Sequence, residues 1–128
     1  MRIAYVDSSC LIAVALQEEG AGELLVRLSR FDRLVSSPLA EAEFRSALVR
    51  EGVPGKGGNL LSWLDWIQPY RRLTPEMEQI LALGRPRGAD LWHLACALFV
   101  RPKLKDLHFL TRDGGQSDIA QALDFPGL

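Results

Sequence analysis

Short apolar segments alternate with longer amphipathic stretches along this chain of 128 residues. We predict β-strands at residues 3–6, 34–36, 70–73 and 108–111. Helix-length segments separate them, which is typical of a parallel sheet whose strands are connected by helices on both faces. The pattern therefore predicts an α/β fold with three α/β/α layers around a parallel sheet of four to five strands.

The segments between the strands carry the end signals of helices. Ser8 or Ser9 is placed to cap the first helix, and Ser117 or Asp118 is placed to cap the last. Ser37 precedes a proline, which favours a first helical turn. The predicted order is β-α-α-β-α-α-β-α-α-β-α. The predicted helices span residues 10–16, 21–30, 38–50, 59–67, 74–84, 89–100 and 117–123, with a glycine-rich turn at 52–58.

Length and composition predict one globular domain, residues 1–128, because 128 residues are enough to bury a proper core. No apolar run reaches membrane-spanning length and the first residues lack a signal-peptide pattern, so we expect a cytoplasmic protein without a membrane partner. Cys10 and Cys96 lie in apolar helical contexts without metal-ligand spacing. They are interpreted as buried thiols in a reducing compartment.

Four acidic residues are predicted to meet at one edge of the sheet. Asp7 ends the first strand and Asp113 follows the last, while Glu43 and Asp90 lie near the starts of helices. In a parallel sheet, helix N-termini and strand C-termini share the edge where such folds bind ligands. Carboxylates gathered there repel one another unless a cation binds, and oxygen ligands favour Mg²⁺ or Mn²⁺. Thr111 adds a hydroxyl group on the same side as Asp113.

Each acid also has an ordinary interpretation as a helix cap, a turn residue or a first-turn acid. Glu41 is placed to form a surface ion pair with Arg45 four residues later, whereas Glu43 lacks such a partner, so we favour Glu43 for the site. His93 is interpreted as a packed, hydrogen-bonded core residue rather than a ligand. The role of Asp118, as a cap or an outer carboxylate, stays open.

The net charge of −1 does not by itself indicate a nucleic-acid-binding protein. Basic residues nevertheless accompany the acidic ones along the sequence. They form either a mixed solvated surface or a basic rim around an acidic centre that engages phosphates. These residues are Arg45, Arg50, Arg85, Arg87, Arg101, Lys103, Lys105 and Arg112.

Four sequence blocks together resemble a known family. They are VDSS at 6–9, SSPL at 36–39 followed by Glu43, ADLWHLA at 89–95, and LTRD at 110–113. In this order they resemble the motif blocks of PIN-domain nucleases, and most closely those of VapC-type toxins of prokaryotic toxin–antitoxin pairs. The resemblance spans nearly the whole chain. It departs from the family at residues 114–118, which are more polar than the family pattern.

The resemblance implies a metal-dependent endoribonuclease that cleaves single-stranded RNA. The family's acidic positions correspond to Asp7, Glu43, Asp90 and Asp113, which would hold one or two Mg²⁺ or Mn²⁺ ions, and its hydroxyl position corresponds to Thr111. The implied partners are RNA, a cognate antitoxin protein that covers the groove, and a second copy in a homodimer.

Two other functions fit parts of the pattern. A catalytically inactive PIN-like module would bind a protein or RNA partner and use the acids only as caps. A phosphoaspartyl receiver domain is disfavoured, because it needs an acidic pair after the first strand and this sequence has Asp7 alone.

Overall fold

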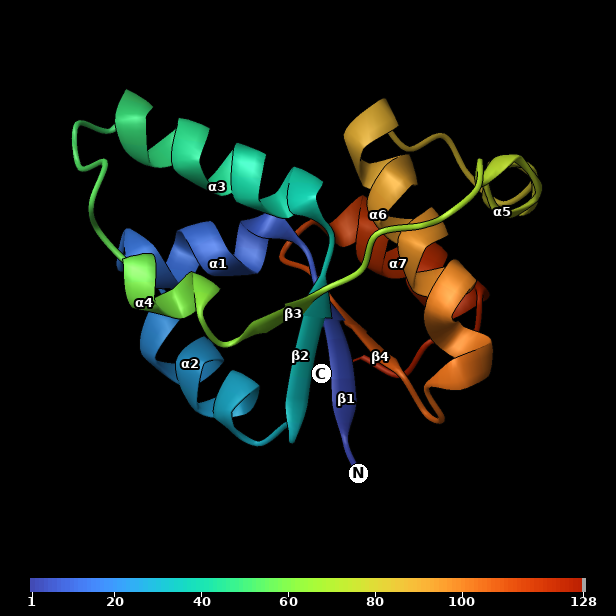
Figure 1. Cartoon of the computed structure of the whole chain (residues 1–128), viewed down its shortest axis with the longest axis horizontal. Helices are drawn as coiled ribbons and strands as arrows, with labels where there is room; N and C mark the ends of the chain where they lie inside the picture. Colours follow the sequence, from blue (N-terminus) through green and yellow to red (C-terminus); the bar gives the residue numbers. More distant parts are fainter. Residues whose placement is uncertain (128) are drawn as a thin grey trace.

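The computed structural model describes residues 1–127. Four strands form one parallel sheet in the order β3-β2-β1-β4 (Figure 1). Along the chain the elements are β1 (Ile3–Val6), α1 (Ser8–Ala15), α2 (Ala21–Ser29), β2 (Arg33–Ser36), α3 (Pro38–Arg50), α4 (Gly58–Leu61), β3 (Leu64–Trp66), α5 (Thr74–Leu81), α6 (Gly88–Val100), the 3₁₀ turn η1 (Arg101–Lys103), β4 (His108–Leu110) and α7 (Gly114–Ala122).

Strand β1 lies inside the sheet, between β2 and β4. All four of its residues are buried. Ile3 and Tyr5 join the core on one face, while Ala4 and Val6 join the core on the other. A strand that is covered on both faces consists of consecutive apolar residues, and this pattern allowed β1 to be predicted correctly from the sequence.

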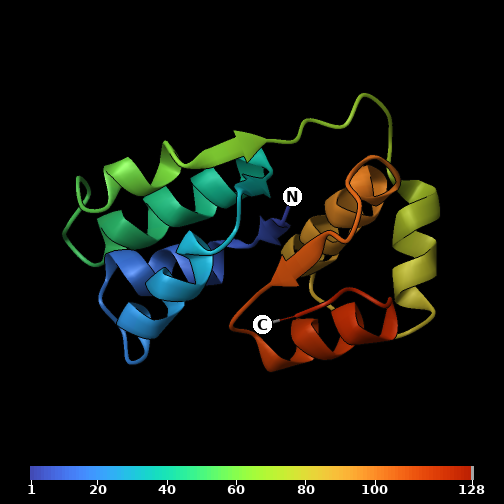
Figure 2. The same cartoon turned by 90° about the horizontal axis from the view of Figure 1, so that it is seen from below.

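Helices cover both faces of the sheet. Helices α1 to α4 pack on one face around Phe44 and Leu48, and α5 to α7 pack on the other around Ile80 and Leu94. Figure 2 shows the two groups of helices separated by the strands. The α/β class and the parallel sheet are therefore confirmed, with four strands.

The predicted helix at residues 59–67 is correct only as far as Leu61 and wrong beyond it. Helix α4 ends at Leu61, and the chain then extends into β3. Leu60, Leu64 and Ile67 have the spacing of a helix face, and all three are buried. They are buried in different ways, on α4, on β3 and in the following loop, so the spacing alone does not distinguish a helix from this arrangement.

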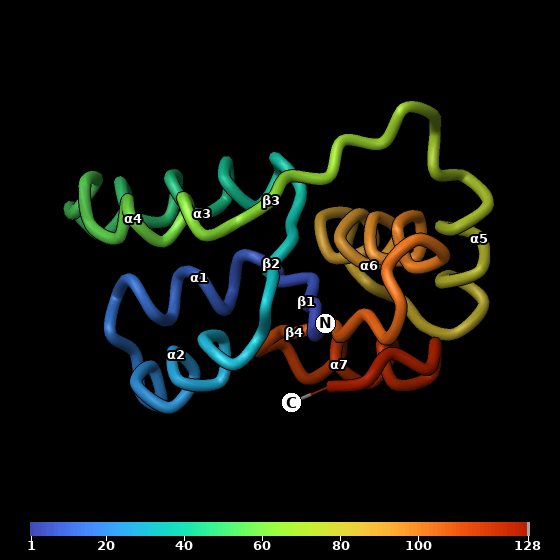
Figure 3. The backbone as a smooth tube through the Cα atoms, turned by 60° about the horizontal axis from the view of Figure 1, so that its bottom comes forward, coloured from blue at the N-terminus to red at the C-terminus, as the bar shows by residue number. Residues whose placement is uncertain are grey.

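The third strand is therefore β3 and not residues 70–73, which adopt irregular structure. Strand β3 pairs with β2 at the sheet edge, with Val35 opposite Asp65, and Arg33 Nε lies 2.8 Å from Asp65 Oδ2 across the pair. Figure 3 shows the segment after β3 passing from the α3–α4 side of the molecule to α5 on the other side. Because the chain changes sides here, α5 and α6 pack on the face of the sheet opposite to α1–α4.

Both cysteines are buried and free, as predicted. Burial raises the pKa of both thiols, that of Cys96 to about 12, so both stay protonated at neutral pH. Over residues 1–127, none of the helices combines the length and the apolar character that crossing a bilayer requires.

Candidate functional site at the carboxyl ends of the strands

The candidate site lies where the strand order reverses. Strand β1 connects to β2 on one side, and the chain later returns to place β4 on its other side. The backbone N–H of Asp7, just after β1, donates to the carbonyl oxygen of Leu110 at 3.2 Å. The segments that follow β1 and β4 therefore begin side by side, at the position where open α/β sheets bind ligands.

Asp7 is the N-cap of α1, so the prediction that Ser8 or Ser9 caps this helix is wrong. Its Oδ1 atom accepts hydrogen bonds from the backbone N–H of Ser9 at 3.1 Å and of Cys10 at 3.4 Å, and from the Ser9 hydroxyl at 2.6 Å. The extended backbone of Asp7 aims its carboxylate at these amides. The side chain is buried, and Asp7 is only 3% exposed.

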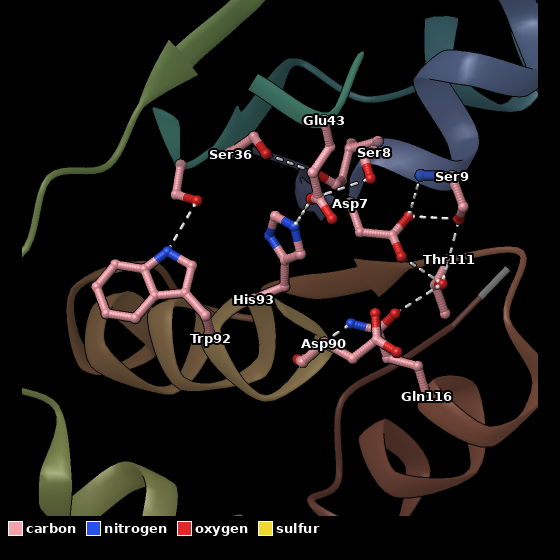
Figure 4. A network of polar contacts seen from close by, with 12 residues as sticks. Asp7, Ser8, Ser9, Ser36, Glu43, Asp90, Trp92, His93, Thr111 and Gln116 are labelled. Carbon is pink, nitrogen blue, oxygen red and sulfur yellow. Dashed lines mark hydrogen bonds and ion pairs between the residues drawn. The ribbon is translucent and has the colours of Figure 1, made fainter. Parts of the chain in front are cut away.

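The second carboxylate oxygen of Asp7 binds the hydroxyl group of Thr111. Thr111 Oγ1 donates to Asp7 Oδ2 at 2.6 Å and accepts from the backbone N–H of Asp113 at 3.1 Å. Its distance to Gln116 Oε1 is 3.1 Å, and Gln116 Nε2 donates to the carbonyl of Asp90 at 3.3 Å. Gln116 thus ties α7 to α6 beside the site (Figure 4). Sequence reasoning missed this buried residue because its burial depends on how α7 packs against α6 and β4, which no local pattern shows.

Glu43 faces this side of the molecule, as predicted. Its Oε1 atom accepts from the Ser8 hydroxyl at 3.1 Å and lies 2.7 Å from His93 Nε2. Glu41, two residues earlier, instead pairs with Arg45 at 2.7 Å on the surface. The predicted surface pair of Glu41 with Arg45 is confirmed, and Glu43 stays the predicted site residue of the two.

His93 is a buried link between the core and Glu43. It is 1% exposed, and its Nδ1 atom lies 2.7 Å from the Tyr5 hydroxyl. Burial raises the pKa of Tyr5 well above its usual value, so this hydroxyl keeps its proton and donates to Nδ1. The other ring nitrogen then carries the proton that binds Glu43. The prediction of a packed, hydrogen-bonded histidine is confirmed.

The electrostatics show that the acidic groups act on one another. Burial raises the pKa of Asp90, and the negative charges of Asp113, Asp7 and Glu43 raise it further. Burial also raises the pKa of Asp7, against the hydrogen bonds from Ser9 and Thr111. Burial disfavours ionised Glu43 too, but its contacts with His93 outweigh this effect and hold its pKa below the usual value.

Asp113 is the N-cap of α7, where its Oδ1 atom accepts from the N–H of Gly115 at 3.1 Å. The prediction that Ser117 or Asp118 caps this helix is therefore wrong, because α7 begins three residues earlier than expected. Asp118 is exposed on the helix surface.

Asp90 and Asp113 line one cavity of about 350 Å³, together with Gln116. Two residues of the predicted basic rim, Arg85 and Arg87, line the same cavity. Four other members of the predicted rim donate hydrogen bonds to protein groups outside this cavity: Arg45 to Glu41, Arg50 to Ser46, Arg101 to the Leu123 carbonyl, and Arg112 to the Glu19 carbonyl.

The donor chemistry of the site fits a hard divalent cation. The side-chain donors are carboxylate and hydroxyl oxygens, and a cation would offset the mutual repulsion that raises the pKa of Asp90. Within residues 1–127, however, no three Asp, Glu, His or Cys side chains approach closely enough to form a ready-made metal site. The acids gather at one edge but do not form a closed coordination shell.

No known protein-family model matches the sequence, and no curated protein is significantly similar to it. The likeness to PIN-domain nucleases therefore depends on the four motif blocks alone. The geometry above is independent of that likeness, because it follows from the contacts of this chain.

Proposed function

We propose that this protein is a metal-dependent endoribonuclease of the PIN type that cleaves single-stranded RNA. The observation that carries the proposal is the gathering of Asp7, Glu43, Asp90 and Asp113 at the carboxyl edge of a parallel sheet, where their charges act on Asp90. Carboxyl groups that raise the pKa of a neighbouring acid, one of them the buried Asp7, are costly to gather, and such groups are typical of functional sites.

The proposed cofactor is Mg²⁺ or Mn²⁺, held by the oxygens of Asp7, Asp90, Asp113 and Glu43. Bound there, a divalent ion supplies Lewis-acid chemistry for in-line hydrolysis of a phosphodiester, which leaves a 5′-phosphate and a 3′-hydroxyl.

The side chains around the acids would orient them and the substrate. Thr111 holds Asp7 through Oδ2, and His93 holds Glu43 through Oε1, which leaves the Glu43 Oε2 atom free of hydrogen bonds within the described residues. Arg85 and Arg87 lie in the cavity beside Asp90, where their charges suit the phosphates of an RNA strand.

The narrower proposal is that the protein is the cytoplasmic toxin of a toxin–antitoxin pair, with a cognate antitoxin and a homodimeric state. It is supported only by the motif resemblance. We expect expression of the intact chain to arrest growth of a bacterial host, and expression of the Asp7→Asn variant not to do so.

One observation favours a second candidate function. Asp7 and Asp113 each have a structural role as an N-cap, and no three acids of the described chain converge closely. These features suit a catalytically inactive PIN-like module that binds a protein or RNA partner.

Cleavage assays decide between the two candidates. We expect wild-type protein to cut single-stranded RNA with Mn²⁺ or Mg²⁺ and to lose activity with excess chelator. Asp7→Asn and Glu43→Gln should each lower the rate at least about 100-fold, because each removes a proposed ligand charge but keeps a similar shape. The matched control is Glu41→Gln, on the same helix as Glu43, which should cleave like the wild type.

Equal cleavage by wild type and Asp7→Asn, or cleavage that survives the chelator, would remove the catalytic assignment. RNA binding without any cleavage in either metal would favour the inactive module.

A further inference from the structure

A second cavity, of about 430 Å³, lies near the acidic site and shares no lining residue with the cavity at Asp90 and Asp113. Its lining residues are Pro38, Leu39, Gln68, Pro69 and Trp92. The volume is in the range of small-ligand pockets, and the lining is mostly apolar. Neither the hydrogen-bond network around Asp7 nor the cavity at Asp90 and Asp113 includes these residues.

The cavity adjoins the acidic site through two helices. On α6, Trp92 directly precedes His93, and on α3, Leu39 lies four residues, or about one turn, before Glu43. Figure 4 shows Trp92 on the far side of His93 from Thr111 and Gln116. A strand of RNA that passes the acids therefore has this cavity on one side and the cavity with Arg85 on the other.

The side chains that line the cavity favour a ligand group that is neutral and planar. None of the five lining side chains is ionisable, so the cavity offers no charge to a phosphate. An indole and two proline rings offer flat apolar surfaces. Gln68 is the polar side chain of the lining, and it is exposed and makes no hydrogen bond within the described residues. Its amide can both donate and accept, as the edge of a nucleobase requires.

The Trp92 ring is already held in place. Its Nε1–H donates to the hydroxyl of Ser37 at 3.2 Å, and Ser37 is fully buried at the start of α3. This hydrogen bond orients the indole ring, while the Trp92 side chain is only partly buried and keeps part of its surface accessible. A preset aromatic ring loses little entropy when a base stacks on it.

We propose that this cavity binds one unpaired nucleobase of the RNA, stacked on Trp92 with its edge against Gln68. The inference rests on the proposed function, because that function brings the strand to the acids. It also agrees with the proposed single-stranded substrate, since a base paired in a duplex must first be unpaired and unstacked, at a cost in free energy, to enter a side pocket.

The test compares binding of two oligonucleotides to the Asp7→Asn protein, which prevents cleavage during the measurement. One is a fluorescent single-stranded RNA, and the other has the same length and backbone but abasic sites. We expect Trp92→Ala to weaken binding of the first by about 5- to 150-fold, the worth of one stacked base, and to leave the second unchanged. Trp92→Phe, which keeps an aromatic ring, should retain most of the affinity.

Trp63→Ala is the control, because Trp63 is an exposed tryptophan that precedes β3 at the opposite end of the strands. It should bind both oligonucleotides like the parent. If Trp92→Ala fails to fold, Gln68→Glu decides instead, since it adds a charge to the pocket at an exposed loop position. It should weaken binding of the base-containing RNA severalfold more than binding of the abasic strand.

The pocket and the nuclease proposal fail in different ways. Base-dependent binding that needs Trp92, in a protein that never cleaves RNA, would support the pocket and overturn the nuclease. Cleavage by the wild type, with base-containing RNA binding equally to the parent, Trp92→Ala and Gln68→Glu, would overturn the pocket. A surface that serves a protein partner would give this second result.

Discussion

Asp7 is both the cap of α1 and a buried carboxyl group. As a cap, it satisfies the first amides of the helix, a role that typically contributes about 1 kcal/mol. As a buried acid it has a raised pKa, so folding disfavours its ionised form. The two effects can be separated, because asparagine retains the capping oxygen and lacks the charge.

We predict that Asp7→Asn stabilises the metal-free protein in a pH-dependent way. A carboxyl group with a raised folded pKa contributes stability that is present below its unfolded pKa and lost as the pH rises through its folded pKa. The wild type therefore loses this contribution to the free energy of unfolding as the pH rises above the usual pKa of an aspartate. The variant has no ionisable group at position 7, so its stability does not fall for this reason. The advantage of the variant should grow with pH through this window, by about 1.4 kcal/mol for each unit of pKa difference.

Urea unfolding with chelator present, across a pH series, measures this difference. The control is Asp113→Asn, the same change at an exposed N-cap, where the gain should be smaller. Parallel stability curves for wild type and Asp7→Asn would contradict the prediction.

His93 shows how a single residue links the core to the site. Its two ring nitrogens meet Tyr5 and Glu43, each at 2.7 Å. A buried imidazole in an apolar helix must pair both nitrogens, because an unpaired buried polar group costs about 1–3 kcal/mol. The need for partners was predictable, but their identities depend on how α3 and α6 pack.

At the scale of elements, the connection from α3 to β3 depends on a glycine with a left-handed backbone. The chain enters α4 through Gly57, whose backbone has a φ of +74°. A Cβ atom at this glycine would lie 2.9 Å from the Cβ of Ala15 and 3.3 Å from Phe44 Cζ. The left-handed turn and the close approach to α1 both require glycine here.

We predict that Gly57→Ala destabilises the protein by about 1–3 kcal/mol, because it combines a strained backbone with a close contact. Gly58→Ala is the matched control one residue later. It starts α4, and a Cβ there meets nothing within 4 Å, so it should be neutral or stabilise by up to about 1 kcal/mol. Thermal unfolding measures both, and equal effects of the two substitutions would contradict the explanation.

At the scale of the whole molecule, the acidic edge exists only when both helical layers are docked on the sheet. Asp7 and Asp113 follow β1 and β4, Glu43 comes from α3 on one face, and Asp90 comes from α6 on the other. A cation bound among them would bind the folded state alone. Metal binding and global stability are therefore linked.

We predict that Mn²⁺ raises the free energy of unfolding of the wild type, by about 2.7 kcal/mol at 100 times its dissociation constant. Asp90→Asn should show a clearly smaller shift, because it removes a proposed ligand charge. Thermal unfolding over a Mn²⁺ titration measures the effect, with Glu41→Gln expected to respond like the wild type. A shift of equal size in Asp90→Asn, or no shift in the wild type, would count against the metal site.

Features that depend on local burial and spacing could be predicted from the sequence. Strands β1, β2 and β4 were located because each contains adjacent apolar residues that are buried: all of β1, Leu34 and Val35 in β2, and Phe109 and Leu110 in β4. Parallel connectivity then implied that Asp7 and Asp113 end on one edge. The spacing of Glu41 and Arg45 marked a surface ion pair and left Glu43 without such a partner on the helix.

Other features follow only from the tertiary structure: strand β3, the helix caps Asp7 and Asp113, and the hydrogen bonds that connect the acids to the core. Strand β3 contains no run of adjacent apolar buried residues, because Asp65 and Trp66 are exposed. Its buried Leu64 has the spacing of a helix face with Leu60 and Ile67, so local pattern does not identify the strand. The positions of Gln116 and Tyr5 beside the acids depend on partners between 5 and 88 residues away. Packing of separate helices against the sheet creates such contacts, and no local sequence signal encodes the final separation of the acids.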